Sequence, residues 1–317
     1  TTNAVSGAGN YYIHVQDTGG RISHSSSVSL TGAVTLLDRL STLGVTTYVD
    51  TTAGVDYSKT SVDNGTNGLY LLSSTSSNEN PIYFYRGAVD NNLLYAGFCW
   101  KIIRTTEYGG LKLIYNGTPS SGSCNNTGTN SQLSSTSAFN SNKDANAYVG
   151  YMYGSTSSSA TYAQTHANTN PSTIKTAIDN WYSSNMTSHT SELEKVVFCN
   201  DRSLDSTSPV TEAYLSTTSS GNIYFANYNT KTTLECTYQT DAFSVDNPKA
   251  GGNNKMENVG FMSTPEARLI TSTVFNNSNY YWLGSPYHWN SGPAIVYGVS
   301  SSGVYGSGVS YTNGVRP

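Results

Sequence analysis

Residues 279–317 carry the pattern that most constrains the fold of this chain. Apolar residues alternate there with Tyr, Ser, Asn, His and Trp, and glycines interrupt the run at short intervals; the apolar anchors are Trp282, Leu283, Ile295, Val296, Val299, Val304, Val309 and Val315. Alternation with a period of two buries one face of a β-strand, and glycine breaks mark turns. This tail therefore predicts short antiparallel strands joined by glycine turns.

The residues between these anchors are typical of a binding surface. Tyr and Trp offer a large contact area with few torsions to freeze, and Ser, Asn and Gly offer adaptable hydrogen bonds. A regular strand cannot bury all of the run Tyr287-His288-Trp289 on one side, so we expect at least one of the three to be exposed. We interpret the tail as a rigid frame that holds exchangeable contact residues. The alternative is a tyrosine-rich sheet face packed against the N-terminal segment.

Composition limits the classes of partner. Of the 317 residues only 11% are charged, and the formal net charge is −4, so we expect no nucleic-acid partner, which would need a basic surface. Ser, Thr, Asn and Gly are abundant, as in many extracellular bacterial proteins. No apolar stretch reaches the roughly 20 residues that span a bilayer. We therefore expect no membrane span in this chain and place any export signal or anchor outside it.

The cysteines are Cys99, Cys124, Cys199 and Cys236, and they allow three pairings that the sequence alone leaves open. Loop-closure entropy favours the local pairs Cys99–Cys124 and Cys199–Cys236. Buried free thiols are the alternative. The spacing does not match a zinc site. With this composition we favour disulfides and an oxidising location.

We divide the chain at residue 67. Residues 1–67 are expected to form a small N-terminal module of unknown role, with a strand at 11–15 and a helix at 30–44. Residues 68–317 are expected to form the main domain, which is rich in branched and aromatic residues from its start. Strands are predicted there at 81–86, 94–105 and 111–115, with a hairpin turn at 107–110.

Helices are few in the rest of the main domain. The clearest is predicted over 171–186, with Asn170 as its cap, Pro171 in its first turn and a core-packing face. The residues of that face are Ile174, Ala177, Ile178 and Trp181. A strand is expected at 195–199, a short capped helix from Ser263 to about Ile270, and a long polar loop over 117–145. This order of elements predicts an α+β domain with antiparallel strands, one or two helices and long irregular loops.

Three stretches together resemble a known family. They are Gly97–Arg104 with Leu111–Gly117, Val197–Ser203, and Tyr281–Pro286 with Gly314–Pro317. On these motifs residues 68–317 resemble surface proteins of gut Firmicutes whose C-terminal domain has a C-type lectin-like fold. Within that group the region of about 276–317 is similar to the variable proteins of diversity-generating retroelements. In those systems an error-prone reverse transcriptase, acting at template adenines, rewrites a short cassette near the end of the gene.

The resemblance implies that residues of the tail have two roles. In this family fixed residues hold the fold, while exposed residues between them vary and contact the ligand. Carried over by position, the frame is Trp282, Leu283, Ser285, Pro286, Gly314, Val315 and Arg316. The expected contact residues are Tyr280, Tyr287, His288, Trp289, Asn290, Tyr297, Ser300, Tyr305, Ser307, Tyr311 and Asn313. Many of these are residues that an adenine-rich Asn codon reaches by changes at its adenines alone.

Motifs for metal binding and catalysis are missing from the sequence. Calcium-dependent sugar lectins use Glu-Pro-Asn or Gln-Pro-Asp with Trp-Asn-Asp, because calcium needs clustered oxygen ligands; Trp289-Asn290-Ser291 lacks the acid. The formylglycine-generating enzyme shares the general fold but uses a late cysteine pair, and no cysteine follows Cys236. The histidines lack metal spacing, and no nucleophile or phosphate-loop motif occurs. We therefore expect no enzyme activity, no metal and no cofactor.

These observations predict a surface-displayed binding protein, on a bacterial cell or a phage particle. Its aromatic-rich tail would recognise varied protein or glycan targets on another cell or host surface. The alternative is a pilin-like or tail-fibre subunit that uses the same aromatic face for assembly.

Overall fold

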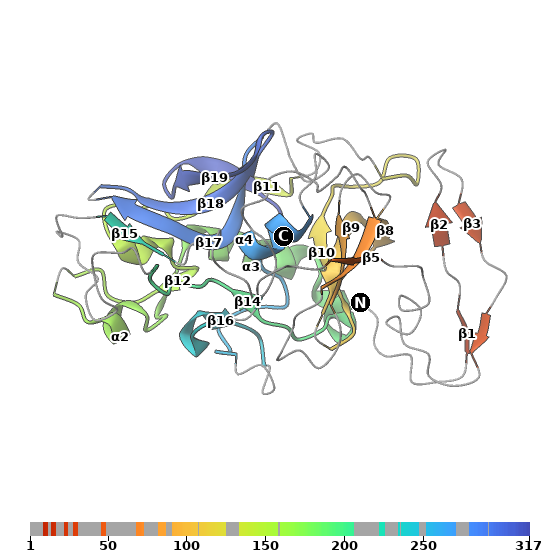
Figure 1. The fold of residues 1–317 in the computed structure, drawn as a ribbon, viewed down its shortest axis with the longest axis horizontal. Coiled ribbons are helices and arrows are strands. Elements are labelled where there is room, and N and C mark those ends of the chain that lie inside the picture. Colours follow the sequence, from red (N-terminus) through yellow and green to blue (C-terminus); the bar gives the residue numbers. More distant parts are fainter. Residues whose placement is uncertain are drawn as a thin grey trace.

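The computed structural model describes residues 82–86, 91–106, 108–124, 133–157, 159–205, 222–225, 234, 236–246, 252–270, 279–290 and 292–317, together with six short strands in residues 9–72. Mostly antiparallel strands are combined with a few helices (Figure 1), so the architecture is α+β, as predicted. Within these residues no helix is both long enough and apolar enough to cross a membrane.

The first sheet has the strand order β10-β9-β7-β6-β5, with β8 paired to β9. Its strands are β5 (Thr46–Tyr48), β6 (Gly68–Leu72), β7 (Tyr83–Arg86), β8 (Asn92–Tyr95), β9 (Phe98–Thr105) and β10 (Leu111–Tyr115). Three of them confirm the strands predicted at 81–86, 94–105 and 111–115, except that a tight turn divides the second into β8 and β9. Ala96 and Gly97 form this turn with φ of 52° and 77°, and positive φ at both central positions matches the twist of a hairpin.

The N-terminal strands are β1 (Gly9–Tyr11), β2 (His14–Gln16), β3 (Ile22–His24) and β4 (Val28–Leu30). β1 pairs with β4, and β2 pairs with β3. The strand predicted at 11–15 is thus divided between β1 and β2, and the helix predicted at 30–44 lies outside the described residues. The boundary at residue 67 stays a prediction; β5 on its N-terminal side pairs with β6 on its C-terminal side.

The second sheet, which we name the tail sheet, has the order β11-β20-β17-β18-β19, with β15 paired to β17. Its strands are β11 (Ser135–Ala138), β15 (Asn222–Tyr224), β17 (Tyr281–Asn290), β18 (Ala294–Ser300), β19 (Gly303–Gly308) and β20 (Thr312–Val315). The antiparallel pairs β17–β18 and β18–β19 confirm the prediction for the tail. β20 is the exception, because it pairs with β17 in parallel.

β11 corrects the prediction that residues 117–145 are one long loop. Ser135–Ala138 pairs antiparallel with β20, from Ser135↔Val315 to Ala138↔Thr312. This segment has no apolar alternation of its own, since it reads Ser-Thr-Ser-Ala. Its strand conformation therefore comes from the backbone partners that β20 supplies at the edge of the tail sheet.

The main helix, α3 (Thr173–Asn185), begins two residues later than its first predicted position. Its N-cap is Ser172, whose side chain accepts a hydrogen bond from the Lys175 backbone N–H at 3.2 Å. Asn170 and Pro171 instead form the strand β13, paired with β12 (Met152–Tyr153). Ile174 and Ile178 are fully buried, which confirms the predicted core face.

The second predicted helix is α4 (Thr264–Ile270), and its start is a capping box. Ser263 donates its backbone N–H to Glu266 Oε2 at 2.9 Å, and the Ser263 hydroxyl accepts from the Glu266 N–H at 3.4 Å. The strand predicted at 195–199 is shortened to β14 (Phe198–Cys199), which pairs with β16 (Ala242–Phe243). The remaining elements are α2 (Tyr162–Thr165) and the 3-10 helices η3 (Asn146–Val149), η4 (Thr187–Glu192) and η5 (Gln239–Asp241).

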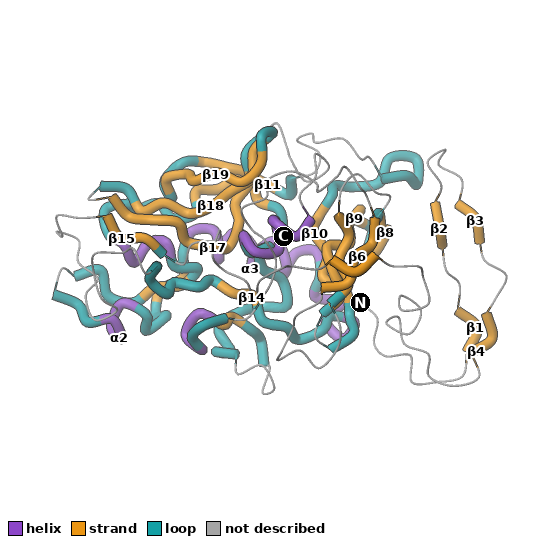
Figure 2. Tube along the Cα trace, viewed as in Figure 1, coloured by secondary structure: helices purple, strands orange, loops and turns teal. Residues whose placement is uncertain are grey.

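The tail sheet lies between two hydrophobic cores. Ala294 and Val296 of β18 pack into one core with α3 and η3, whereas Tyr297 and Val299 pack into the other with α4 and the first sheet. Figure 2 shows helices, in purple, next to the strands of the tail sheet. Because alternate residues of β18 face opposite sides, this strand is buried on both faces.

Both local cysteine pairs are bonded. Cys99–Cys124 and Cys199–Cys236 are disulfides across sequence separations of 25 and 37. They confirm the pairing favoured by loop closure and exclude the free-thiol alternative. Disulfides of this kind are typical of extracellular proteins.

Candidate ligand-binding surface

An irregularity in β17 decides where the run Tyr287-His288-Trp289 points. The register across β17 and β18 shifts between Pro286↔Val296 and His288↔Ile295, which leaves Tyr287 without a cross-strand partner there. A β-bulge of this kind interrupts alternation. Tyr287 and His288 are partly exposed, while Trp289 is 1% exposed and belongs to the core with α3.

The expected contact residues lie on two opposite faces of the tail sheet. Tyr305 and Ser307 share one face of β19, and Gly306 between them faces the other way. A Cβ placed on Gly306 would lie 2.4 Å from Cδ1 of Tyr287. Tyr287 is therefore on the face opposite Tyr305, and one continuous surface does not include both.

On the first face Tyr280 and Tyr305 form an aromatic pair. Their ring centroids are 4.7 Å apart, and Tyr280 is 50% exposed. The Asn313 amide nitrogen holds this pair in place, because it donates to the Tyr305 hydroxyl at 3.0 Å and to Ser307 Oγ at 3.1 Å. Burial raises the pKa of Tyr305 to about 12, so its hydroxyl stays neutral at physiological pH.

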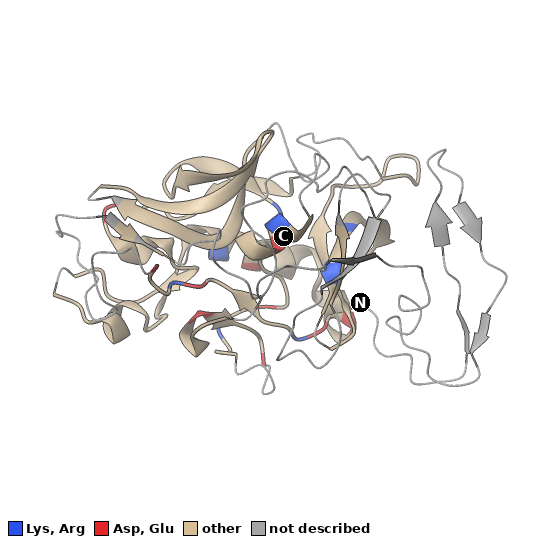
Figure 3. Cartoon of the chain, viewed as in Figure 1, with Lys and Arg blue, Asp and Glu red and all other residues tan. Residues whose placement is uncertain are grey.

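Beside this pair lies an open cavity of about 620 Å³, which we name the Tyr280 hollow. It is formed by Leu133, Ser135, Thr136, Asn279, Tyr280, Thr312, Asn313 and Gly314. These residues come from β11 and the segment before it, from β20, and from the segment that enters β17. None of them is charged, and residues 279–315 as a whole contain no Asp, Glu, Lys or Arg. Figure 3 shows the tail strands free of charged residues.

On the opposite face Tyr287, His288 and Tyr311 form a smaller surface, which we name the Tyr287 patch. Tyr287 packs on Tyr297, with ring centroids 4.6 Å apart, and on His288 at 4.4 Å. Tyr311 is 68% exposed, and its ring lies over Gly308. Partial burial lowers the pKa of His288, which favours its neutral form.

Several expected contact residues are largely buried, which corrects the expectation that they are exposed; of these, Asn313 still lines the Tyr280 hollow. The exposed fractions are 1% for Trp289, 3% for Tyr297, 5% for Ser300, 8% for Ser307 and 7% for Asn313. The bulge turns Trp289 inward, and Tyr287 covers Tyr297. Ser300 accepts from the Ser302 N–H in the β18–β19 turn at 3.2 Å. The side chain of Asn290 is outside the described residues.

The residues assigned to the frame are mostly buried. Trp282 donates its indole N–H to the Ser137 carbonyl at 2.9 Å. Arg316 is 1% exposed and donates to the Tyr115 carbonyl at 2.7 Å and to Asn116 Oδ1 at 3.0 Å. The Ser285 hydroxyl accepts from the Thr264 N–H at 2.9 Å. Leu283, Pro286, Gly314 and Val315 are also buried.

Residues in and just before β11 belong to the hollow but are absent from the site that the sequence predicts. Ser135 and Thr136 of β11 and the preceding Leu133 lie about 145 positions before the tail, in the segment predicted to be a loop. Thr312 and Asn279 were also omitted, although they neighbour the expected residues Asn313 and Tyr280. Adjacency to an expected contact was the available signal for these two; β11 gave no such signal.

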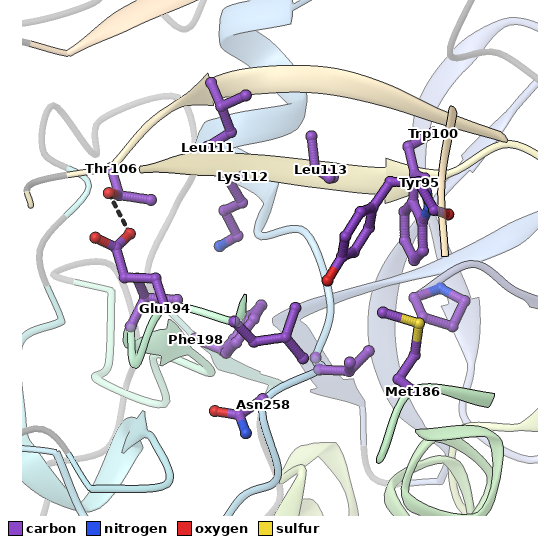
Figure 4. A pocket seen from close by; sticks show the side chains of 15 residues that line it. Tyr95, Trp100, Thr106, Leu111, Lys112, Leu113, Met186, Glu194, Phe198 and Asn258 are labelled. Carbon is purple, nitrogen blue, oxygen red and sulfur yellow. Dashed lines mark hydrogen bonds between the residues drawn. The ribbon is translucent and has the colours of Figure 1, made fainter. Parts of the chain in front are cut away.

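A second cavity, of about 80 Å³, lies between the β9–β10 hairpin and the segment from Leu193 to Phe198. Figure 4 shows Lys112 and the Tyr95 hydroxyl directed into it, with Thr106 and Glu194 hydrogen-bonded at one end. Lys112 is already paired with Glu266 at 2.8 Å and stands 4.5 Å from the centre of the Phe198 ring. The small size and mainly apolar walls of this second cavity are typical of a packing defect in the interior, not of a site for a macromolecular ligand.

Metal binding has no candidate site in the part of the chain that the structure describes, where no cluster of three or more His, Cys, Asp or Glu is present. The fold and the surface thus define a class: an α+β, disulfide-bonded protein with an uncharged hollow beside an exposed aromatic pair. Comparison of the chain with protein-family models, with curated proteins and with solved structures gave no match.

Proposed function

We propose that this protein is an extracellular binding protein that holds its ligand in the Tyr280 hollow. The observation that carries the proposal is a half-exposed tyrosine, Tyr280, packed on the partly buried and hydrogen-bonded Tyr305, beside a hollow of about 620 Å³. Cavities of roughly 300–1,000 Å³ are typical of ligand sites. Exposed tyrosines that are held rigidly are also common binding hot spots.

We further propose that the main domain has a C-type lectin-like fold and that its tail is diversified by a retroelement. Support comes from the separation of buried frame residues from exposed residues within the tail. Trp282, Leu283 and Val315 are buried in the cores, whereas Tyr280 and Thr312 reach the surface. Substitutions at such exposed positions alter a binding surface without removing core contacts. The targets would be proteins or glycans on another cell or host surface.

The test is a binding comparison of single variants. The wild-type protein is screened against displayed extracellular proteins and immobilised cell-surface glycans, and Kd is measured for each hit. Tyr280→Ala is expected to raise Kd at least about tenfold, as for a hot-spot residue, and to leave the melting temperature nearly unchanged.

Tyr311→Ala is the matched control, because Tyr311 is similarly exposed but lies on the opposite face of the tail sheet. It should bind like the wild type. Loss of binding in Tyr311→Ala with none in Tyr280→Ala would move the site to the Tyr287 patch and contradict the proposal.

A further inference from the structure

The chemistry of the Tyr280 hollow also identifies a class of ligand, an inference that rests on the proposed function. Among the described residues, its walls supply hydroxyl groups from Ser135, Thr136 and Thr312 and amides from Asn279 and Asn313, and none of them is charged. A charged ligand would lose its hydration here without gaining a counter-ion, which is costly. The walls therefore favour a neutral ligand with many hydrogen-bonding groups.

Asn313 favours a ligand that donates hydrogen bonds. Both hydrogen bonds that it donates go to the tail sheet itself, to Tyr305 and Ser307. Its Oδ1 carbonyl has no hydrogen-bond partner among the described residues and is left as an acceptor at the wall of the hollow. A ligand hydroxyl is a suitable donor to this oxygen.

Tyr280 adds an apolar surface to these polar groups. Its ring is half exposed and is supported from behind by Tyr305, 4.7 Å away. An aromatic ring with a polar tip suits a ligand that has both C–H and O–H surfaces. Sugar rings have this combination, because their C–H groups form an apolar face and their hydroxyls point outward.

We infer that the Tyr280 hollow binds a neutral oligosaccharide, with one sugar ring against Tyr280 and sugar hydroxyls on Asn313, Thr312 and Ser135. The described residues hold no cluster of acidic or histidine ligands for a metal, so the recognition is direct and does not require calcium. Because the hollow is open to solvent, a bound chain of more than one sugar unit would extend from it.

The experiment is a glycan array that carries neutral oligosaccharides of glucose, galactose, mannose, fucose and N-acetylhexosamines beside sialylated and sulfated forms of the same glycans. The wild type should bind a subset of the neutral glycans. Addition of about 10 mM EDTA, which removes calcium, should leave the signal unchanged. Tyr280→Ala should reduce the signal at least about tenfold. Tyr280→Phe, which keeps the ring, should stay within about threefold of the wild type.

The outcomes separate this inference from the proposed function. Binding only to acidic glycans, loss of binding in EDTA, or no binding to any neutral glycan overturns the inference. If Tyr280→Ala instead abolishes binding to a protein ligand, the proposed function stands and the glycan assignment falls. If Tyr280→Ala binds every ligand as the wild type does, the proposed function fails as well.

Discussion

At the scale of single residues, the absence of a side chain at Gly306 makes room for Tyr287. A Cβ at this position would approach the Tyr287 ring to 2.4 Å. Gly306→Ala should therefore displace the ring and lower the free energy of unfolding by about 1–3 kcal/mol, as overpacking does. Urea unfolding measures the change.

Gly308→Ala is the matched control for Gly306→Ala. Its Cβ would meet the Tyr311 ring at 3.2 Å, and because Tyr311 is 68% exposed, that ring has room to move. We expect a loss below about 1 kcal/mol. Equal losses in the two variants would contradict the packing assigned to Tyr287.

His166 should make the protein sensitive to mild acid. Its side chain is buried against Tyr162, with ring centroids 3.8 Å apart, and burial together with the nearby Arg202 charge lowers its pKa to about 3. The unfolded chain binds a proton near the ordinary His pKa of about 6.5, whereas the folded protein does not. Stability is therefore fully present above pH 6.5 or so and falls as the pH decreases toward 3.

His166→Phe tests this pH dependence, because phenylalanine keeps a ring against Tyr162 but does not titrate. The free energy of unfolding is measured from pH 7 to pH 5, above the range in which carboxylates titrate. The slope with pH should be smaller in the variant than in the wild type, whatever its absolute stability. An unchanged slope would show that folding does not lower the pKa of His166, and would contradict the proton linkage assigned to it.

At the scale of elements, Glu266 joins α4 to the β9–β10 hairpin. It accepts from Arg104 at 2.8 Å and from Lys112 at 2.8 Å, and these side chains are at most 7% exposed. Burial alone would raise the pKa of Glu266, but the charges of Lys112 and Arg104 outweigh it and hold the pKa at about 2. The carboxylate thus stays ionised throughout the physiological range.

Glu266→Gln should remove the carboxylate charge that two buried cations, Arg104 and Lys112, share, and cost about 3–5 kcal/mol of stability. The exposed pair Lys195–Asp246, 3.3 Å apart, provides the control, since Asp246→Asn should cost less than about 1 kcal/mol. Chemical unfolding of both variants gives the comparison. A small loss in Glu266→Gln would mean that the ion pairs contribute little to holding α4 in place.

Elements with local signals were predictable from sequence, and those set by distant partners were not. The Ser263–Glu266 capping box and the strands β7 to β10 of the first sheet are specified by their own residues. By contrast, β11 is a strand only because β20 pairs with it, and the start of α3 is displaced because Asn170 and Pro171 pair with β12. Neither partnership leaves a pattern within the segment itself.

At the scale of the whole molecule, the tail sheet is enclosed by a core on each face. The sequence showed an alternating tail with exposed aromatics, and Tyr280 and Tyr311 are exposed. It could not show that β18 is covered on both sides, nor that a bulge sends Trp289 inward. For this reason part of the expected contact surface proved to be interior, and the remainder is divided between two faces.

The central claim is that the tail combines a fixed core with an exchangeable surface in the Tyr280 hollow. The most direct measurement is a saturation library at Tyr280 and Thr312, compared with one at Trp289 and Val296, displayed on cells and sorted by resistance to protease. Most substitutions at the first two positions should leave the fold intact, whereas most at the buried pair should destroy it. If Tyr280 and Thr312 tolerate as few residues as Trp289 and Val296, the hollow is part of the structural core and the account is contradicted.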